Sequence, residues 1–194
     1  MLPPGEMNGR RSTFNQADYK QFLGYIKTAE QKYGIVLHCY VLMGNHYHLL
    51  IETPHANLSK AMHHINSSYT TYMNRKRKRA GHLFQGRYKA IIIEKENYLV
   101  ELSRYIHLNP VRAGMVEKPE EYSYSSYKAY VTKERDEVVT QELIFGMISM
   151  QKGDARKKYR TYVESANEKE LENPLKNVYG GIDSGKQGIH KGNS

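Results

Sequence analysis

The sequence predicts an α+β fold, in which amphipathic helices flank a short antiparallel hairpin. Apolar side chains recur at threes and fours over 16–33 and 58–79, which is typical of helices with one buried face. The runs 35–43 and 46–52 are apolar and β-prone, which indicates two strands. Gly and Asn within 43–45 tolerate the backbone of a tight turn, so this turn is expected to join the strands.

Two more elements extend this pattern. The run 87–93 predicts a third strand, whose residues 90–93 are expected to be buried on both faces. The following stretch 94–108 predicts a third helix, which Pro110 should end. The order of helix, strand, strand, helix, strand, helix matches a ferredoxin-like (split βαβ) antiparallel sheet with helices on one face, except that its first strand is missing.

The chain has 194 residues, enough for one domain with a core and an appendage. We expect a disordered start at 1–14, a main domain at 15–130, a small helical C-terminal extension at 131–179 and a disordered tail at 180–194. The extension is expected to hold two short helices, whereas Gly, Ser, Lys and Asn dominate the tail.

The formal net charge of +9 favours a polyanion, above all nucleic acid, as the partner. A merely soluble basic protein would show the same excess. The sequence contains no long apolar run and no signal peptide, so we expect a cytoplasmic protein without a membrane partner. Its single cysteine, Cys39, cannot form an intrachain disulfide and is expected to be buried.

Two histidines at the start of the second strand form the first candidate site. His46 and His48 are two residues apart, so in a strand both imidazoles project from one face and could share one metal ion. The alternative is a partly exposed strand with two ordinary histidines.

Tyr105 and Asn109 form the second candidate site. They are four residues apart in the third predicted helix and therefore share a face. The amide oxygen of Asn109 could complete a metal site with the two histidines, and Tyr105 would then lie one turn from the ion. A phenol is a poor nucleophile at its free pKa of about 10, but a nearby cation that also polarises a phosphate would assist it. Alternatively, Tyr105 is a core residue and Asn109 caps the helix; His107 points to another face.

Five consecutive cations, Arg75 to Arg79, follow the second predicted helix. Cations suit a helix C-terminus, but five adjacent ones repel one another unless an anion is near. We interpret them as a phosphate-contacting patch, with a solvated charged helix end as the alternative.

These residues resemble those of a known family. His46-Tyr47-His48 resembles the His-hydrophobic-His motif of the HUH endonuclease superfamily. The stretch 104–114, Arg-Tyr-Ile-His-Leu-Asn-Pro-Val-Arg-Ala-Gly, is similar to the tyrosine-helix segment of its single-tyrosine members, the REP-associated tyrosine transposases. The stretches 81–89 and 125–127 are also similar, and the resemblance runs from about residue 10 to 181.

The resemblance implies a catalytic domain at 15–130 that binds single-stranded or hairpin DNA and acts as a monomer or homodimer. It implies Mg²⁺ or Mn²⁺ held by His46, His48 and Asn109, and Tyr105 as a nucleophile that leaves a 5′-phosphotyrosine and a free 3′-OH. Relatives begin with a strand that residues 1–6 are too short and too proline-rich to supply. The DNA-binding residues would be Arg75, Lys76, Arg77, Lys78, Arg79, Arg87, Lys89 and Arg112.

Two readings of the function therefore stand. The first is a single-strand DNA nuclease and strand transferase that acts in DNA transposition. The second is a catalytically decayed or truncated copy that only binds DNA. A metal-dependent hydrolase of small molecules would explain neither the cation run nor Tyr105.

Overall fold

The structure is a computed structural model, and it describes residues 14–166 except for 85, 87, 94–96 and 150–151. The predicted disordered tail and nearly all of the predicted disordered start lie outside the described residues. The described elements, in chain order, are α1 (Gln16–Tyr33), β1 (Val36–Leu42), β2 (Tyr47–Glu52), α2 (Leu58–Lys76), α3 (Asn97–Arg112), the 3₁₀ turn η1 (Pro119–Glu121), α4 (Tyr127–Val131), α5 (Glu142–Ile148) and α6 (Lys152–Glu164).

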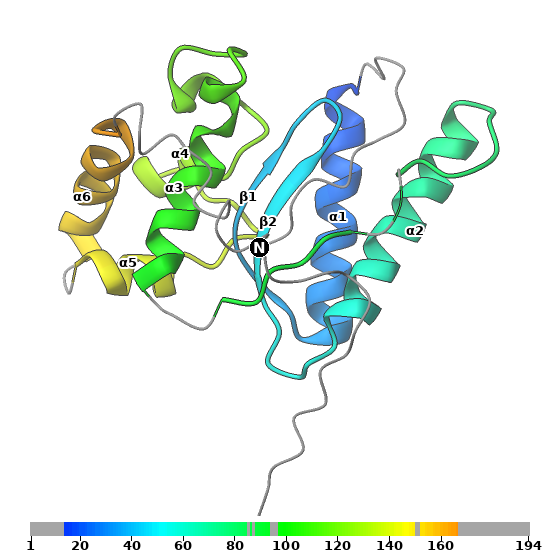
Figure 1. Cartoon of the computed structure of the whole chain (residues 1–194), viewed down its shortest axis with the longest axis horizontal. Helices are drawn as coiled ribbons and strands as arrows, with labels where there is room; N and C mark the ends of the chain where they lie inside the picture. The colour runs from blue at the N-terminus through cyan, green and yellow to red at the C-terminus, as the bar shows by residue number, and fades with distance from the viewer. Residues whose placement is uncertain (1–13, 85, 87, 94–96, 150–151, 167–194) are drawn as a thin grey trace, which may run out of the picture.

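The β1–β2 hairpin lies between two groups of helices (Figure 1). Because strand side chains alternate, Tyr40, Leu42 and Leu49 pack on one face with α1 and α2. Cys39 and Leu50 point to the opposite face and pack with α3 and the C-terminal helices. The predicted α+β class is confirmed. The sequence also predicted that the helices lie on one face of the sheet. In the structure α1 and α2 cover one face, and α3 covers the other.

Capping residues fix both ends of α1. Asn15 and Asp18 form a reciprocal capping box, in which each side chain accepts a hydrogen bond from the other's backbone N–H. Gly34 ends the helix with φ +66°, a conformation that glycine adopts without strain. Asn is a common residue at the start of a helix and Gly directly after its end, so the local sequence favours both boundaries.

The hairpin has the predicted turn. The N–H of Met43 donates to the carbonyl of His46 at 2.7 Å and closes the bend. Val41 lies opposite His48, and Leu42 lies opposite Tyr47. An irregularity between Leu37 and Cys39 shifts the pairing by one residue, and the buried Cys39 packs in the core, where burial raises the pKa of its thiol.

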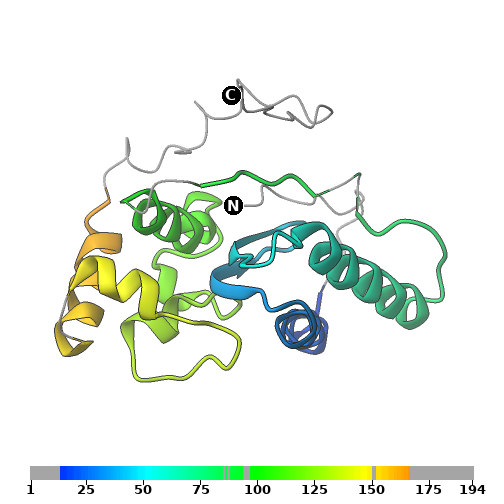
Figure 2. The same cartoon turned by 90° about the horizontal axis from the view of Figure 1, so that it is seen from below.

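The predicted third strand at 87–93 is wrong for the residues that the structure describes. Residues 88–93 run without regular structure from the α2 side of the molecule toward α3 (Figure 2). Ile91 is buried, but Ile92 is 82% exposed, so the run is not covered on both faces. A strand needs a neighbour that pairs with its backbone groups, and within the described part of the chain no segment pairs with 88–93. The expected missing first strand falls at 1–6, outside the described residues.

Pro110 does not end α3. The helix continues to Arg112, and the N–H of Ala113 still donates to the carbonyl of Asn109 at 3.0 Å. Pro110 forfeits one intrahelical hydrogen bond, but Ile106 and Leu108 around it are buried in the core. Tertiary burial thus outweighs the local preference, and Asn109 lies inside the helix instead of capping it.

The Ser/Tyr-rich segment after η1 covers the outer edge of β1. Leu42 donates its N–H to the carbonyl of Tyr124 at 2.9 Å, and Ser126 donates its N–H to the carbonyl of Tyr40 at 3.1 Å. These bonds satisfy backbone groups that an edge strand would otherwise expose.

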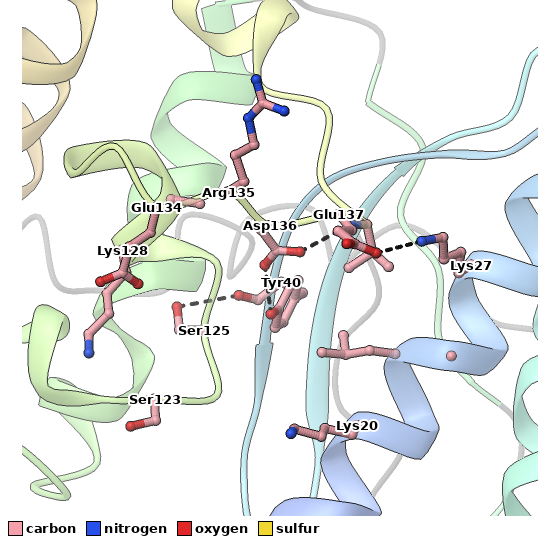
Figure 3. A pocket seen from close by; sticks show the side chains of 14 residues that line it. Lys20, Lys27, Tyr40, Ser123, Ser125, Lys128, Glu134, Arg135, Asp136 and Glu137 are labelled. Atoms are coloured by element: carbon pink, nitrogen blue, oxygen red, sulfur yellow. Dashed lines mark hydrogen bonds and ion pairs between the residues drawn. The ribbon is translucent and has the colours of Figure 1, made fainter.

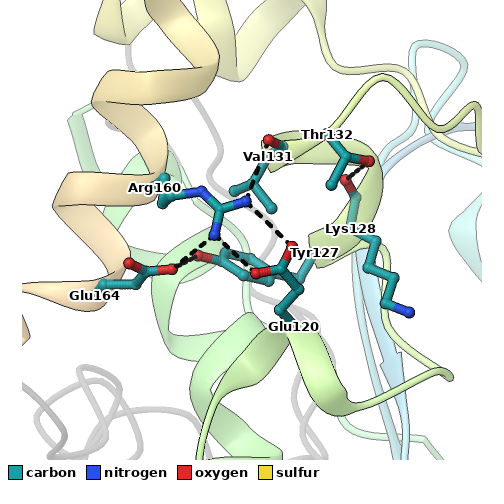
Figure 4. A network of polar contacts seen from close by, with 7 residues as sticks. All are labelled: Glu120, Tyr127, Lys128, Val131, Thr132, Arg160 and Glu164. Atoms are coloured by element: carbon teal, nitrogen blue, oxygen red, sulfur yellow. Dashed lines mark hydrogen bonds and ion pairs between the residues drawn. The ribbon is translucent and has the colours of Figure 1, made fainter.

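The C-terminal helices share the core of α3. Arg160 of α6 forms ion pairs with Glu120 at 2.7 Å and Glu164 at 3.3 Å, and Tyr127 donates its hydroxyl to Glu164 (Figure 4). The hydrogen bond from Arg160 holds the pKa of Glu120 below its usual range. This network ties α6 to η1 and α4, so the extension supports the helix that bears Tyr105.

A buried histidine joins α3, α4 and α6. His107 Nδ1 lies 2.6 Å from the Tyr159 hydroxyl, and Nε2 lies 2.8 Å from the Ser126 hydroxyl. Tyr159 donates its hydroxyl onward to Ser103 at 2.9 Å. Burial lowers the pKa of His107 from 6.5 to about 3. His107 is therefore a neutral core residue.

The burial of His107 makes the folded protein less stable at low pH. His107 protonates in the unfolded chain below its ordinary pKa of 6.5 but in the folded chain only near 3, so the unfolded state binds more protons within that window. We expect the free energy of unfolding to fall by roughly 2 kcal/mol between about pH 6.5 and pH 4.5 through this group. Denaturant unfolding across this range, compared with His107→Gln, measures it. A slope in His107→Gln equal to that of the wild type would contradict the account.

No helix in the described part of the chain is long and apolar enough to cross a membrane.

Candidate functional site

The two histidines lie side by side at the bend of the hairpin. The ring centroids of His46 and His48 are 5.1 Å apart, and the rings are nearly perpendicular at 87°. His48 is buried within β2, whereas His46 lies directly before the strand and is partly exposed. Their two-residue spacing therefore brings both imidazoles together, as predicted.

The bend also sets the tautomer of His46. Its Nδ1 lies 2.7 Å from the side-chain oxygen of Asn45, and an oxygen at that distance requires the nitrogen to carry the proton. Nε2 is then the nitrogen with the lone pair. Metal-binding histidines commonly donate their second ring N–H in this way, because the bond fixes the orientation of the ring.

Tyr105 on α3 faces this pair. The ring centroids of His48 and Tyr105 are 5.9 Å apart, with the rings nearly perpendicular at 81°. Tyr105 is 9% exposed, so its ring is packed while the residue still reaches the surface. The predicted meeting of a helical tyrosine with the histidine hairpin is present.

Asn109 follows one turn after Tyr105 and is tied to it. Its side-chain nitrogen donates to the carbonyl of Tyr105 at 2.9 Å, so the amide oxygen is the atom that could bind a cation. The described residues contain no cluster of three or more His, Cys, Asp or Glu side chains. Among the described residues, a third protein ligand beside the histidines would therefore be of another type, and an amide oxygen suits Mg²⁺ or Mn²⁺.

Arg112 contacts the nucleophile candidate directly. Its guanidinium carbon lies 4.6 Å from the centroid of the Tyr105 ring, within the range of a cation–π interaction. The spacing of seven residues places both side chains on one face of α3. Sequence reasoning assigned Arg112 to DNA and missed this contact, although the two-turn spacing could have indicated it.

The cation run lies at the same end of the molecule as the histidines. The bend of the hairpin, the first turn of α1 and the last turns of α2 and α3 all lie at this end (Figure 1). α2 ends at Lys76, earlier than predicted, and Arg77 and Lys78 follow in a turn.

Only part of the run is directed at solvent. Lys76 pairs with the buried Asp18 at 2.5 Å. Burial alone would raise the pKa of Asp18, but the hydrogen bonds from Lys76, Asn15 and Tyr72 outweigh it and hold the pKa low. Arg75 and Lys78 are exposed.

The other predicted DNA-binding residues have mixed outcomes. Lys89 is exposed within the irregular run 88–93. Arg87 lies outside the described residues.

A groove of about 420 Å³ lies elsewhere, between α1 and the segment 134–138 (Figure 3). Lys27 pairs with Glu137 at 2.7 Å, and the Tyr40 hydroxyl donates to Asp136 at 2.8 Å. These contacts occupy charged groups in the groove and join α1 and β1 to the segment. None of the predicted site residues lines it.

The fold and this geometry define an α+β protein in which a histidine hairpin faces a tyrosine-bearing helix. The family model described as "Transposase IS200 like" matches residues 6–109, more than half of the chain and a span that includes His46, His48, Tyr105 and Asn109. The chain therefore belongs to the IS200-like transposase family, which acts in DNA transposition, and the resemblance drawn from the sequence is confirmed.

A solved structure of a REP-associated tyrosine transposase bound to a REP hairpin has a similar fold. The two chains are 18% identical with a TM-score of 0.56, and the match covers 68% of this chain and 82% of the other. No curated protein matches.

Proposed function

We propose that this transposase cleaves and rejoins single-stranded DNA through a covalent bond to Tyr105. The observation that carries the proposal is the approach of Tyr105 to His48, with ring centroids 5.9 Å apart. A phenol beside an imidazole pair at a basic end of the molecule suits attack on a phosphodiester. The REP hairpin bound to the structural neighbour supports hairpin DNA as the substrate class.

The cleavage step is a transesterification. The Tyr105 oxygen forms a bond to phosphorus, the bond from phosphorus to O3′ breaks, and O3′ gains a proton as the phenol loses one. The products are a 5′-phosphotyrosine and a free 3′-OH. Because one phosphate ester replaces another, a 3′-OH can reverse the step on a new partner without ATP.

His46, His48 and Asn109 would hold Mg²⁺ or Mn²⁺. When bound, such an ion acts as a Lewis acid that polarises a phosphate oxygen. The hydrogen bond between His46 and Asn45 keeps the imidazole oriented, and the bond from Asn109 to the Tyr105 carbonyl keeps the amide beside the nucleophile.

Incubation of the full chain with a single-stranded hairpin oligonucleotide and Mn²⁺ tests the proposal. A protein–DNA adduct that survives denaturing electrophoresis, and that a chelator prevents, is the expected result. Binding without an adduct under any metal condition would instead indicate a DNA-binding protein that has lost catalysis.

The exposed cations of the run should set the salt dependence of binding. Each phosphate contact on a single strand contributes about 0.7 to the slope of log affinity against log salt. We expect Arg75→Gln with Lys78→Gln to lower the magnitude of the slope by roughly 1.4, measured by fluorescence anisotropy at several salt concentrations. An unchanged slope would show that these side chains do not contact the backbone.

Lys76→Gln serves as the contrasting variant. Removal of its ammonium leaves the buried carboxylate of Asp18 without its cation, so a lower midpoint of thermal unfolding is expected. A wild-type midpoint with a smaller salt slope would instead place Lys76 on the DNA.

A further inference from the structure

Arg112 lies outside the stretch that the family model matches. Its side chain contacts Tyr105, the proposed nucleophile. The family match ends at residue 109. The guanidinium of Arg112 nevertheless lies 4.6 Å from the ring of Tyr105. It approaches from the last turn of α3, and its side chain is exposed.

We propose that Arg112 is a positioning residue for Tyr105, which holds the phenol ring and stabilises the negative charge on its oxygen during cleavage and rejoining. This inference rests on the proposed function of Tyr105. It goes beyond that function because it assigns Arg112 to the nucleophile in addition to the DNA backbone.

Two contacts define the position of the ring. The His48 ring meets it nearly at right angles, with an interplanar angle of 81°. The Arg112 guanidinium lies over the ring within cation–π distance. With Tyr105 only 9% exposed, these neighbours leave the ring little room to turn.

The charge of Arg112 matters most when the phenol carries charge. In cleavage, the bond between the phenol oxygen and phosphorus forms while the P–O3′ bond breaks, and the phenol proton is lost as O3′ gains one. In rejoining, a 3′-OH attacks phosphorus and the phenol oxygen departs with the electron pair. A fixed cation a few ångströms away stabilises the developing phenolate in both directions.

The phenol of Tyr105 is neutral before cleavage, and the phosphodiester carries one negative charge both in the DNA and in the tyrosyl adduct. The cation therefore changes the balance between these two states much less than it stabilises the phenolate. Loss of Arg112 should therefore slow cleavage and rejoining by similar factors and leave the equilibrium fraction of adduct nearly unchanged. A residue that acted only by binding the DNA backbone would change the affinity and salt slope instead.

Single-turnover kinetics of the full chain at saturating hairpin oligonucleotide and Mn²⁺ provide the test. We expect Arg112→Gln to slow adduct formation roughly tenfold. Arg112→Lys keeps the charge and should restore a part of the rate. Lys60→Gln removes one exposed cation from the first turn of α2 and should behave as the wild type.

The outcomes separate this inference from the function on which it rests. If Arg112→Gln weakens DNA binding but matches the wild-type rate at saturation, Arg112 is a backbone contact only. If Arg112→Lys is as slow as Arg112→Gln, the charge is not what matters and the role is structural. If the wild type forms no adduct, the proposed function and this inference fall together.

Discussion

Replacement of Tyr105 by phenylalanine is expected to abolish the covalent protein–DNA adduct and to leave DNA binding nearly intact. The substitution removes only the phenol oxygen, so the ring can keep its contacts with His48 and Arg112. Loss of a nucleophile typically costs several orders of magnitude, and we expect the rate of adduct formation to fall more than about 10⁴-fold. Denaturing electrophoresis of labelled hairpin DNA measures the adduct, and fluorescence anisotropy measures binding.

Tyr98→Phe is the matched control for this variant. Tyr98 lies two turns earlier on α3 and is likewise a tyrosine that packs against the core. It should form adduct at the wild-type rate. Adduct that persists in Tyr105→Phe, or that disappears in Tyr98→Phe alone, would show that another residue is the nucleophile.

Loss of a histidine from the pair is expected to have the second-largest effect. Replacement of residues that merely support a metal ligand costs roughly 10–100-fold, so removal of a ligand should slow adduct formation by at least about a hundredfold. His46→Ala is the first variant, because His46 is only partly buried. His48→Asn is the second, because His48 is buried in β2 and a polar side chain disturbs its surroundings less than alanine.

Metal binding itself supplies an independent measurement. Mn²⁺ should raise the midpoint of thermal unfolding of the wild type, because a ligand that binds only the folded state stabilises it. The same shift should shrink in His46→Ala. His63→Ala removes an exposed histidine on α2, across the sheet, and should retain both the shift and the rate. A wild-type shift and rate in His46→Ala would exclude His46 as a ligand.

Local patterns were sufficient to predict the hairpin and the long helices. The caps at Asn15 and Gly34, the turn at 43–45 and the helical stripes depend on neighbours in sequence, and the structure contains them all. Local patterns could not decide whether the predicted third strand forms. Residues 88–93 have strand-like composition, but a strand also needs a partner from a distant part of the chain.

The difference between local and long-range contacts also explains which features of the site could be predicted. The pairing of His46 with His48 follows from the strand period. The approach of Tyr105 was expected from a shared metal site and from the family resemblance, because local periodicity alone does not require it. The sequence alone could not show that Lys76 pairs with Asp18, since that contact joins α2 to α1 across the fold. Nor could the sequence show that α3, because it is buried, continues past Pro110 to Arg112.

The central claim is that the Tyr105 oxygen becomes bonded to the 5′-phosphate of the cleaved strand. Proteolysis of the adduct after nuclease trimming, followed by tandem mass spectrometry, locates the modified side chain directly. The account predicts a nucleotide phosphate on Tyr105, in the peptide that also contains His107 and Asn109. A phosphate on any other residue, or cleaved DNA with no phosphate attached to the protein, would contradict it.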